Sequence, residues 1–305
     1  MAVAIPCLPI AFISLGLLAC SPQLVDVVNG KSCCEDPTQE GCGGSGGARA
    51  SGGSGGGGAS ASGGVTSGGT TATGGAVATG GSPPAVLIHR YTFQGDGIDV
   101  TDSVGNANGN VFGTMLDGQG SVALAGGSSD QYVELPSFVL YGLRSASFEA
   151  WVTWNGGPAW QRIFDFGEDL TGLRDGRGTG RSYLFCTPND GTSHAKVSFG
   201  RPGPNNAPVE PTQLVSMAAF PEGQMTHLVV VVDDVSNRIS IFINGGFQGS
   251  QTFNLSLAYV YDINSWLGRS LYATDPSFNG AIHEFRIYSG VLDANQILAN
   301  FQGGL

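Results

Sequence analysis

The strongest hydrophobic pattern in the chain lies in residues 225–253 and predicts three consecutive antiparallel strands. Residues 228–232 are apolar at every position, which is typical of a short strand buried on both faces of a sheet. Isoleucine then recurs at every second position of residues 239–243, as in a strand with one buried face. Asn244-Gly245 follows and favours the positive φ angles of a two-residue hairpin turn. We expect this block to form the centre of a β-sheet.

Shorter strand signals recur along the rest of the chain from residue 86 onward, with turn residues between them and almost no helical periodicity. Many short strands at such spacing are typical of an all-β sandwich or jelly roll. The strands expected outside the central block are residues 87–93, 121–124, 132–135, 147–154, 161–166, 182–186, 196–199, 212–217 and 280–288.

One short helix is expected at the end of the chain. Asp293 in the N-cap position and Gln296 three residues later form a capping box, and the apolar pair Leu292 and Ile297 forms a hydrophobic staple around it. Gly303 follows the last apolar turn and predicts the end of the helix.

Composition divides the chain, because one segment is almost free of apolar and charged residues. Residues 43–82 are nearly all Gly, Ser, Ala or Thr, with Arg49 as the one charged residue and no aromatic residue. Such a segment cannot bury enough apolar surface to offset its ordering entropy, so a disordered Gly/Ser-rich linker is expected. The predicted organisation is a signal peptide (1–19), a short cysteine-containing segment (20–42), the linker (43–85) and one β domain (86–305).

The N-terminus carries an apolar run, residues 10–19, that ends at Cys20. The run is too short for a transmembrane helix and suits the core of a signal peptide. Leu17-Leu18-Ala19-Cys20 resembles the bacterial lipobox, which implies cleavage before Cys20 and lipid attachment to it. An ordinary signal peptide cut nearby, or a misassigned start codon, is the alternative. Lipidation predicts a protein anchored in the bacterial cell envelope outside the cytoplasmic membrane, with the lipid as its only membrane contact.

Cysteines in the segment after Cys20 are expected to form a disulfide, since an extracytoplasmic location permits oxidation. Adjacent cysteines bridge each other poorly, so Cys42 is expected to pair with Cys33 or Cys34. A zinc site would need a fourth ligand, and no further His or Cys lies nearby. Cys186, within a strand-like segment, is interpreted as a buried thiol and not as a nucleophile.

Charge excludes one class of partner. Residues 86–305 contain eleven Lys and Arg against twenty Asp and Glu, a formal net charge of −9. Nucleic-acid binding needs a basic surface that displaces counterions, and this domain would repel phosphate. The acidic surface is interpreted as solubilising, with divalent-cation binding as the alternative.

Several phrases, taken in order, resemble the laminin-G-like jelly roll of the concanavalin A-like lectin and glucanase superfamily. They are TDSVGNANG, DQYVELP, SFEAWVTW, THLVVVV followed by ISIFING, and WLGRS followed by FNGAIHEFRIYSGVLDANQI. The resemblance covers essentially all of residues 86–305 and implies two antiparallel sheets packed face to face, with the termini side by side. It also implies a lectin-like function.

The resemblance implies a possible calcium site as well, since related folds often bind a structural calcium between the first loop and the last strand. Hard oxygen ligands suit calcium, and a solvated turn is the alternative. This chain has His283 where the family typically has Asp. Its phase with Phe285 and Ile287 predicts a neutral, hydrogen-bonded imidazole that points into the interior, with a role as a ligand as the alternative. The candidate calcium ligands are Asp96, Asp99, Asp102, Asn106 and Glu284.

Enzymatic activity is not expected from this sequence. A glucanase of this superfamily needs paired carboxylates in a Glu-x-Asp-x-x-Glu strand, and the sequence contains no such run. The leading hypothesis is a surface-tethered protein that binds a glycan or another surface polymer. A structural or adhesive module with a protein partner is the main alternative, and a divergent glycoside hydrolase is a third.

Sugar sites usually combine exposed aromatic rings with polar side chains on a loop rim or a concave sheet. Each candidate aromatic residue has core or rim packing as its alternative role. An arginine-rich loop, with Arg174, Arg177 and Arg181, fits an acidic glycan or a solvated insertion. The candidate ligand-binding residues are Trp154, Trp160, Tyr272 and Arg177.

Overall fold

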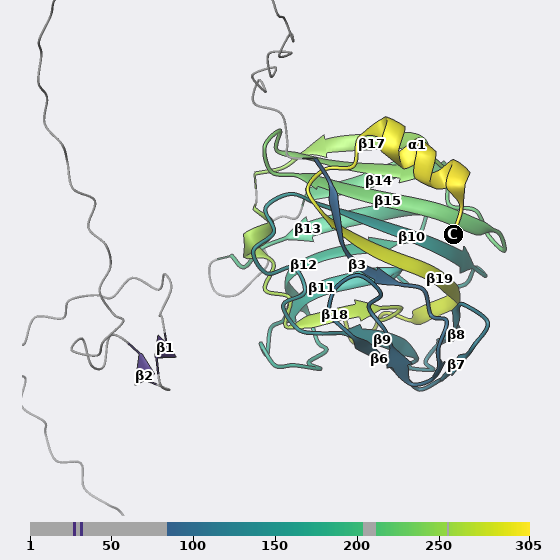
Figure 1. Ribbon diagram of the computed structural model, residues 1–305, viewed down its shortest axis with the longest axis horizontal. Helices are drawn as coiled ribbons and strands as arrows, with labels where there is room; N and C mark the ends of the chain where they lie inside the picture. Colours follow the sequence, from purple (N-terminus) through teal and green to yellow (C-terminus); the bar gives the residue numbers. More distant parts are fainter. Residues whose placement is uncertain (1–26, 29–30, 33–83, 204–211, 255) are drawn as a thin grey trace, which may run out of the picture. The chain divides into compact units, whose positions relative to one another are not determined.

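The computed structural model describes residues 27–28, 31–32, 84–203, 212–254 and 256–305 (Figure 1). The chain divides into two units between Thr73 and Gly74. In the first unit, strands β1 (Val27–Val28) and β2 (Lys31–Ser32) pair in antiparallel orientation. Cys20, Cys33, Cys34 and Cys42, with the signal peptide and residues 43–83 of the predicted linker, lie outside the described residues. The second unit holds a β-sandwich.

One layer of the sandwich is a seven-stranded antiparallel sheet. Its order is β17, β16, β15, β10, β19 and β3, and β8 pairs with the other end of β19. The bounds are β3 Val86–Tyr91, β8 Val122–Gly127, β10 Ala146–Trp154, β15 Met225–Asp233, β16 Arg238–Ile243, β17 Gly246–Thr252 and β19 Ser277–Ser289.

The second layer is an eight-stranded antiparallel sheet in the order β14, β13, β12, β11, β18, β9, β6 and β5. Its bounds are β5 Asp99–Val100, β6 Gly109–Phe112, β9 Tyr132–Leu135, β11 Phe164–Asp169, β12 Gly180–Thr187, β13 His194–Gly200, β14 Thr212–Ala219 and β18 Asn264–Leu267. Strands β4 (Asp96–Gly97) and β7 (Leu116–Asp117) form a separate pair. The predicted all-β, two-sheet antiparallel sandwich is therefore confirmed.

Strand β15 shows why the apolar block is central. It pairs with β10 on one side and β16 on the other, so both of its edges are hydrogen-bonded. Leu228, Val230 and Val232 face the main core between the sheets, whereas Val229 and Val231 belong to a second apolar cluster on the outer face. The hairpin after β16 turns through Asn244 (φ 51°) and Gly245 (φ 74°), as the type I′ turn requires.

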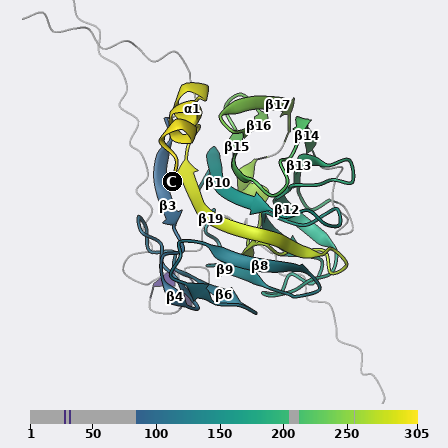
Figure 2. The same cartoon turned by 90° about the vertical axis from the view of Figure 1, so that its right-hand side faces the viewer.

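Helix α1 (Ala294–Gly303) covers that second cluster, and the rotated view shows it on the side of the seven-stranded sheet away from β12 and β13 (Figure 2). The Asp293 and Gln296 capping box is present, and Leu292 and Ile297 are both buried in the cluster. Gly303 is the last helical residue, and Gly304 takes the positive φ that ends the helix. No helix in the described part of the chain is long and apolar enough to cross a membrane.

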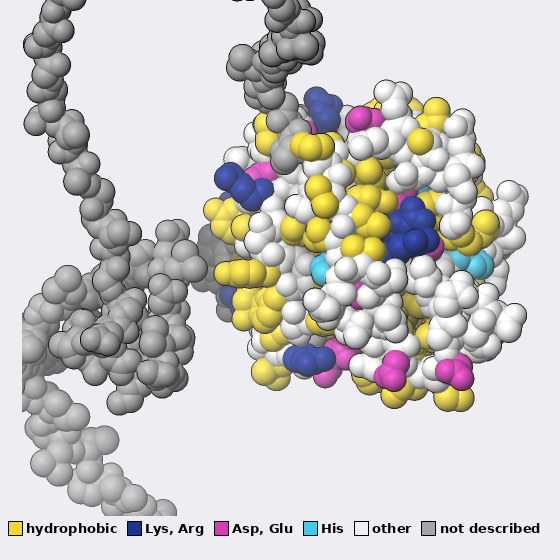
Figure 3. Space-filling model, viewed as in Figure 1, with side chains coloured by type: hydrophobic (Ala, Val, Ile, Leu, Met, Phe, Trp, Pro, Cys, Tyr) yellow, Lys and Arg dark blue, Asp and Glu magenta, His cyan; other side chains and the backbone are white. Residues whose placement is uncertain are grey.

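Buried charge also ties α1 to the sheet. The Glu149 carboxylate on β10 is fully buried, and it accepts hydrogen bonds from His227, Arg286, Tyr288 and, from the helix, Asn300. Burial raises the pKa of Glu149, but its hydrogen-bond partners lower it by a larger amount, so the net pKa lies below its usual value. Hydrophobic and uncharged side chains occupy most of this face, and basic side chains gather near its centre (Figure 3).

Strand β19 differs from the predicted strand pattern at His283. A β-bulge opposite Trp151 and Val152 leaves His283 unpaired, because Glu284 pairs with Trp151 and Ile282 with Val152. The prediction that His283 points into the interior is therefore wrong. Its Nε2 instead lies 2.9 Å from the Thr153 hydroxyl, and burial lowers its pKa, which favours the neutral ring.

The strand predicted over residues 161–166 begins three positions later, at Phe164. The reason lies in Gln161, because its side chain forms hydrogen bonds with backbone groups of a loop. Its Nε2 donates to the Gly156 and Pro158 carbonyls, and its Oε1 accepts from the Asn279 amide. The segment before Phe164 is therefore shaped by side-chain hydrogen bonds and not by a strand ladder.

Candidate functional site

The outer face of the eight-stranded sheet carries an aromatic surface. Along β12, Leu184 and Cys186 belong to the main core, whereas Tyr183 and Phe185 alternate with them and face outward. Cys186 is fully buried and burial raises the pKa of its thiol, as expected for a structural cysteine. The outward-facing cluster consists of Tyr132, Tyr183, Phe185, Trp266 and Leu271, with Tyr272 packed against it.

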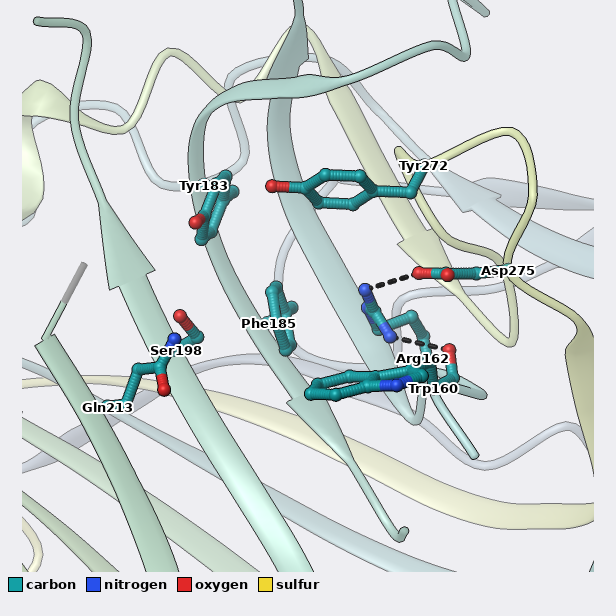
Figure 4. Close-up of a pocket in the computed structure, with 8 residues that line it drawn as sticks. All are labelled: Trp160, Arg162, Tyr183, Phe185, Ser198, Gln213, Tyr272 and Asp275. Atoms are coloured by element: carbon teal, nitrogen blue, oxygen red, sulfur yellow. Dashed lines mark hydrogen bonds and ion pairs between the residues drawn. The ribbon is translucent and has the colours of Figure 1, made fainter. Parts of the chain in front are cut away.

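A pocket of about 220 Å³ opens on this surface (Figure 4). Strands β12, β13 and β14 supply its base, and the two loops after β10 and β18 supply its rim. The rim loops place an indole and a phenol on the pocket, with polar groups between them. The lining residues are Trp160, Arg162, Tyr183, Phe185, Ser198, Gln213, Tyr272 and Asp275.

Trp160 stands on the rim in a conformation that bulky residues rarely adopt, with φ +71°. Its amide donates to the Asn189 carbonyl (2.8 Å), which holds the loop against the β12–β13 turn. The Lys196 ammonium lies 4.9 Å from the centre of the indole ring and is paired with Asp190 at 3.2 Å. Trp160 keeps 36% of its surface exposed, so its ring is available to a ligand.

Arg162 holds the parts of the pocket together from below. Its guanidinium lies over the Phe185 ring (3.9 Å), and its Nη1 donates to the Trp160 carbonyl. Its Nη2 lies 2.7 Å from an Asp275 carboxylate oxygen, and its Nε lies 3.3 Å from Asp165. The Arg162 side chain is only 2% exposed, so it acts as a brace for the two rim loops.

Asp165 lies beneath Arg162 and is fully buried. Burial raises its pKa to about 7, although the Arg162 charge and a hydrogen bond from the Leu271 amide lower it. Asp275 raises it again, because two carboxylates share one guanidinium. This buried group cannot reach a ligand in the pocket.

Tyr272 and Asp275 belong to one loop, and Arg177 positions it. The Arg177 guanidinium donates to the carbonyls of Ser270 (2.9 Å), Tyr272 (3.3 Å) and Asp275 (3.3 Å). A second pocket of about 320 Å³ lies beside this loop, lined by Asp130, Arg177 and Asp275 among others. Asp275 lines both pockets, so together they border the two sides of one loop.

The structure separates the residues predicted to bind a ligand. Trp160 and Tyr272 lie on one pocket, and their contact with a ligand stays a prediction. Arg177 lines the neighbouring pocket but uses most of its donors on the protein. The prediction for Trp154 needs correction: its side chain is 3% exposed in the core, where its Nε1 donates to Gln161.

The other two arginines of the predicted acidic-glycan loop are engaged by carboxylates. Arg174 pairs with Glu134 at 3.2 Å, and Arg181 pairs with Glu168 at 3.5 Å.

The residues proposed as calcium ligands have different surroundings in the structure. Asp102 is 5% exposed and both of its oxygens are used by the protein: Oδ1 accepts from the amides of Arg90, Val104 and Gly105, and Oδ2 accepts from the Ala107 amide and His89. Burial raises its pKa, but these hydrogen bonds lower it to about 2. Asp102 therefore organises the first loop as a saturated acceptor.

The remaining calcium candidates differ in their exposure. Asp96, Asp99 and Asn106 are exposed, and Glu284 is buried against Arg90 and Arg286. No group of three or more His, Cys, Asp or Glu side chains gathers around a common point within the described ranges. Calcium binding at these residues stays a prediction.

A further pocket, of about 740 Å³, has a different chemistry. Most of its lining is apolar, and its aromatic residues are exposed, with Tyr141 at 81% and Tyr261 at 50%. Its one carboxyl group, Asp262, accepts from the Leu140 amide and the Ser265 hydroxyl, and burial raises its pKa to about 7. No cationic side chain lines it.

The two antiparallel sheets packed face to face define a jelly-roll sandwich. A family model described as the concanavalin A-like lectin/glucanases superfamily matches residues 126–298. The chain therefore belongs to this superfamily. No curated protein matches the sequence.

Solved structures show the same fold at low sequence identity. Domain 4 of AbnA, an extracellular arabinanase from Geobacillus stearothermophilus in complex with arabinotriose, is 21% identical with a TM-score of 0.55, over 71% of this chain and 98% of that one. The botulinum neurotoxin serotype G binding domain is 15% identical with a TM-score of 0.53, over 71% and 51%. Trypanosoma rangeli sialidase is 14% identical with a TM-score of 0.52, over 70% and 32%.

Sequence reasoning missed most of the pocket. The alternation of Tyr183 and Phe185 with Leu184 and Cys186 was a usable signal, because two aromatic residues on the outward phase of a strand need a partner. Arg162 gave no local signal, since its partner Asp275 is 113 residues away.

Proposed function

We propose that the domain is a carbohydrate-binding module whose site is the pocket between Trp160 and Tyr272. The observation that carries this proposal is the convergence of two rim aromatics from separate loops on a sheet surface that combines aromatic and polar side chains. Sugar rings present C–H groups on their faces and hydroxyls at their edges. The indole and the phenol suit the faces, and Gln213 and Asp275 offer hydrogen bonds to the edges.

Binding, and not hydrolysis, is the chemistry this pocket supports. Two-carboxylate glycosidases need an acid and a base or nucleophile that both reach the sugar bond. Asp275 is the one carboxylate among the lining residues, and it is held by Arg162 and by the Ser270 hydroxyl. Asp165 lies below the surface and is fully buried.

Trp160→Ala tests the proposal. The side chain is partly exposed and lies outside the main core, so we expect the midpoint of thermal unfolding to stay within a few degrees of wild type. Stacking on an aromatic ring contributes about 1 kcal/mol beyond area burial, so retention on a bound polysaccharide should fall roughly tenfold or more. Affinity electrophoresis of the domain against a panel of polysaccharides measures the loss.

Tyr141→Ala is the matched control, because it removes another exposed aromatic ring that lies on the separate apolar pocket. Equal retention of Trp160→Ala and wild type would refute the site. Failure of the wild-type domain to retain any polysaccharide would refute the function. Capture of an envelope protein that depends on Tyr141 and not on Trp160 would favour the adhesive-module alternative, for which the apolar pocket is the supporting feature.

We further propose that the module is tethered to the cell envelope through a lipid on Cys20. The support is the apolar run that ends at this cysteine. Cys20→Ser should abolish fatty-acid labelling and move the protein from the membrane fraction to the soluble fraction. Unaltered labelling would contradict the anchor without affecting the proposed glycan site.

A further inference from the structure

We infer that the site between Trp160 and Tyr272 selects uncharged glycans and excludes acidic ones. This inference rests on the proposed function and concerns the charge of the same site. It follows from how the cationic side chains around the two neighbouring pockets are paired.

Arginine and lysine residues are abundant on this face, which at first suggests an acidic ligand. Of the residues that line the two pockets, Arg162 and Arg177 are cationic, and Asp130 and Asp275 are anionic. The lining is therefore balanced in formal charge. The excess of twenty acidic over eleven basic residues in residues 86–305 adds a field that repels anions at longer range.

Arg162 cannot offer its charge to a ligand. It contacts two carboxylates, Asp275 at 2.7 Å and Asp165 at 3.3 Å, and its side chain is 2% exposed. Its remaining donor group, Nη1, serves the Trp160 carbonyl. An anion placed here would meet the Asp275 carboxylate before it met the guanidinium.

Arg177 and Arg269 share Asp130. The Asp130 carboxylate lies 3.4 Å from Arg177 Nη1 and 3.1 Å from Arg269 Nε, and its side chain is 53% exposed. Arg269 stacks over Tyr132 and Trp266, at 4.2 and 4.5 Å from the ring centres, and its side chain is 10% exposed. Asp130 carries one negative charge against two arginines, so one positive charge is left over. The neighbouring group offsets it, because Asp165 and Asp275 carry two negative charges against the single charge of Arg162.

Lys196 completes the pattern beside Trp160. Its ammonium lies 3.2 Å from Asp190, and its side chain is 13% exposed. A carboxylate or sulfate on the sugar would have to displace Asp190 or lie next to it, and either arrangement brings two anions together. A neutral sugar meets no such charge repulsion and can use the hydroxyl, amide and carboxylate groups as hydrogen-bond partners.

The test compares one polysaccharide in two charge states. Neutral polysaccharides (arabinan, dextran, mannan and laminarin) and acidic ones (polygalacturonate and alginate) are screened by affinity electrophoresis at pH 8, where Asp165 is ionised. The neutral polymer retained best is then oxidised at part of its primary alcohols, or carboxymethylated if it lacks them, to give a carboxylated version on the same backbone. We expect retention to fall about tenfold or more on the carboxylated polymer.

Salt gives an independent readout. Binding of an uncharged glycan should change less than about twofold between low salt and about 0.5 M NaCl, because no ion pair with the ligand is screened. Stronger retention on acidic polymers that collapses with salt would overturn this inference and leave the proposed function standing. No retention on any polymer would overturn both.

Asp130→Asn tests the charge pairing itself. The residue is half-exposed, so the fold should persist, and the change leaves Arg177 and Arg269 without a carboxylate. We expect the variant to gain about fivefold in retention on the carboxylated polymer at low salt. Asp96→Asn is the matched control, because it makes the same change of net charge at an exposed residue that lines neither pocket. An unchanged Asp130→Asn, or an equal gain in both variants, would refute the role of the pairing.

Discussion

Asp102 offers the sharpest test of how the first loop is held. Its carboxylate is buried and accepts five hydrogen bonds, four from backbone amides and one from His89 at 2.7 Å. Asp102→Ala would leave these donors without their acceptor next to a buried edge of the sandwich. We expect the variant to fold with a lower free energy of unfolding, whatever metal is present.

The magnitude follows from the contacts. Removing one partner of a buried, hydrogen-bonded charge costs about 3 to 5 kcal/mol. For a domain of this size that loss lowers the unfolding midpoint by about 10 °C. The pKa gives a second value, because it lies at about 2 against an ordinary value of 3.8. At 1.36 kcal/mol per pKa unit, the folded state prefers the ionised form by about 2 kcal/mol.

The sign of the pH dependence is fixed by the direction of the shift. A carboxyl whose folded pKa is lowered contributes stability above its unfolded pKa and loses it as pH falls through the folded value. Wild type should therefore lose about 2 kcal/mol between about pH 4 and pH 2 through this group. Asp102→Ala should lack that part of the slope.

Urea unfolding followed by tryptophan fluorescence, with chelator and with excess calcium, measures both effects. Asp99→Ala is the control, because Asp99 is exposed in the same loop and accepts one long hydrogen bond, from Asn110 at 3.3 Å. A loss of stability in Asp102→Ala that occurs only when calcium is present would refute the saturated-acceptor argument. Equal stability of Asp102→Ala and wild type would do so as well.

Two further outcomes are expected. Limited proteolysis should cut first within residues 43–84 and leave a resistant fragment that starts near Val86, the first residue of β3, and early cuts within residues 225–253 would contradict the domain boundary. Burial raises the pKa of Asp165 to about 7, so between about pH 4 and pH 7 the folded state holds a proton that the unfolded chain has released, and the wild-type protein should lose stability as the pH rises. Asp165→Asn should flatten that fall, and a wild-type curve without it would contradict the prediction.

The parts of the fold that could be predicted are those in which the signal is local. Residues 228–232 lie on a strand paired on both edges, and their apolar character at every position reflects a core on one side and α1 on the other. The capping box of α1 could be predicted because both of its hydrogen bonds connect residues three positions apart. The orientation of His283 could not be predicted, since the bulge depends on pairing with β10 and not on the sequence of β19.

The candidate site shows the same limit more strongly. Trp160 and Tyr272 could be selected as loop aromatics, but the selection of Trp154 as a ligand-binding residue was wrong, because its side chain is 3% exposed in the core. The role of Arg162 could not be predicted, because it depends on partners on β11, on β12 and in a loop 113 residues away. The charge pattern along the chain left two interpretations of the arginine loop open, an acidic-glycan site and a solvated insertion.

The pairing of these arginines with carboxylates in space argues against the acidic-glycan interpretation, and the buried Arg162 explains why. Burying a charge is costly unless it is paired and hydrogen-bonded, so each guanidinium that supports the aromatic surface needs a carboxylate beside it. Arg162 joins Phe185, the Trp160 carbonyl and Asp275 in one rigid group, and Arg177 fixes the loop of Tyr272 through three carbonyls. Rings held in this way lose little conformational freedom when a ligand stacks on them. The charges near the pocket thus act on the protein's own loops, and in the proposed site recognition would fall to the uncharged faces and edges that they position.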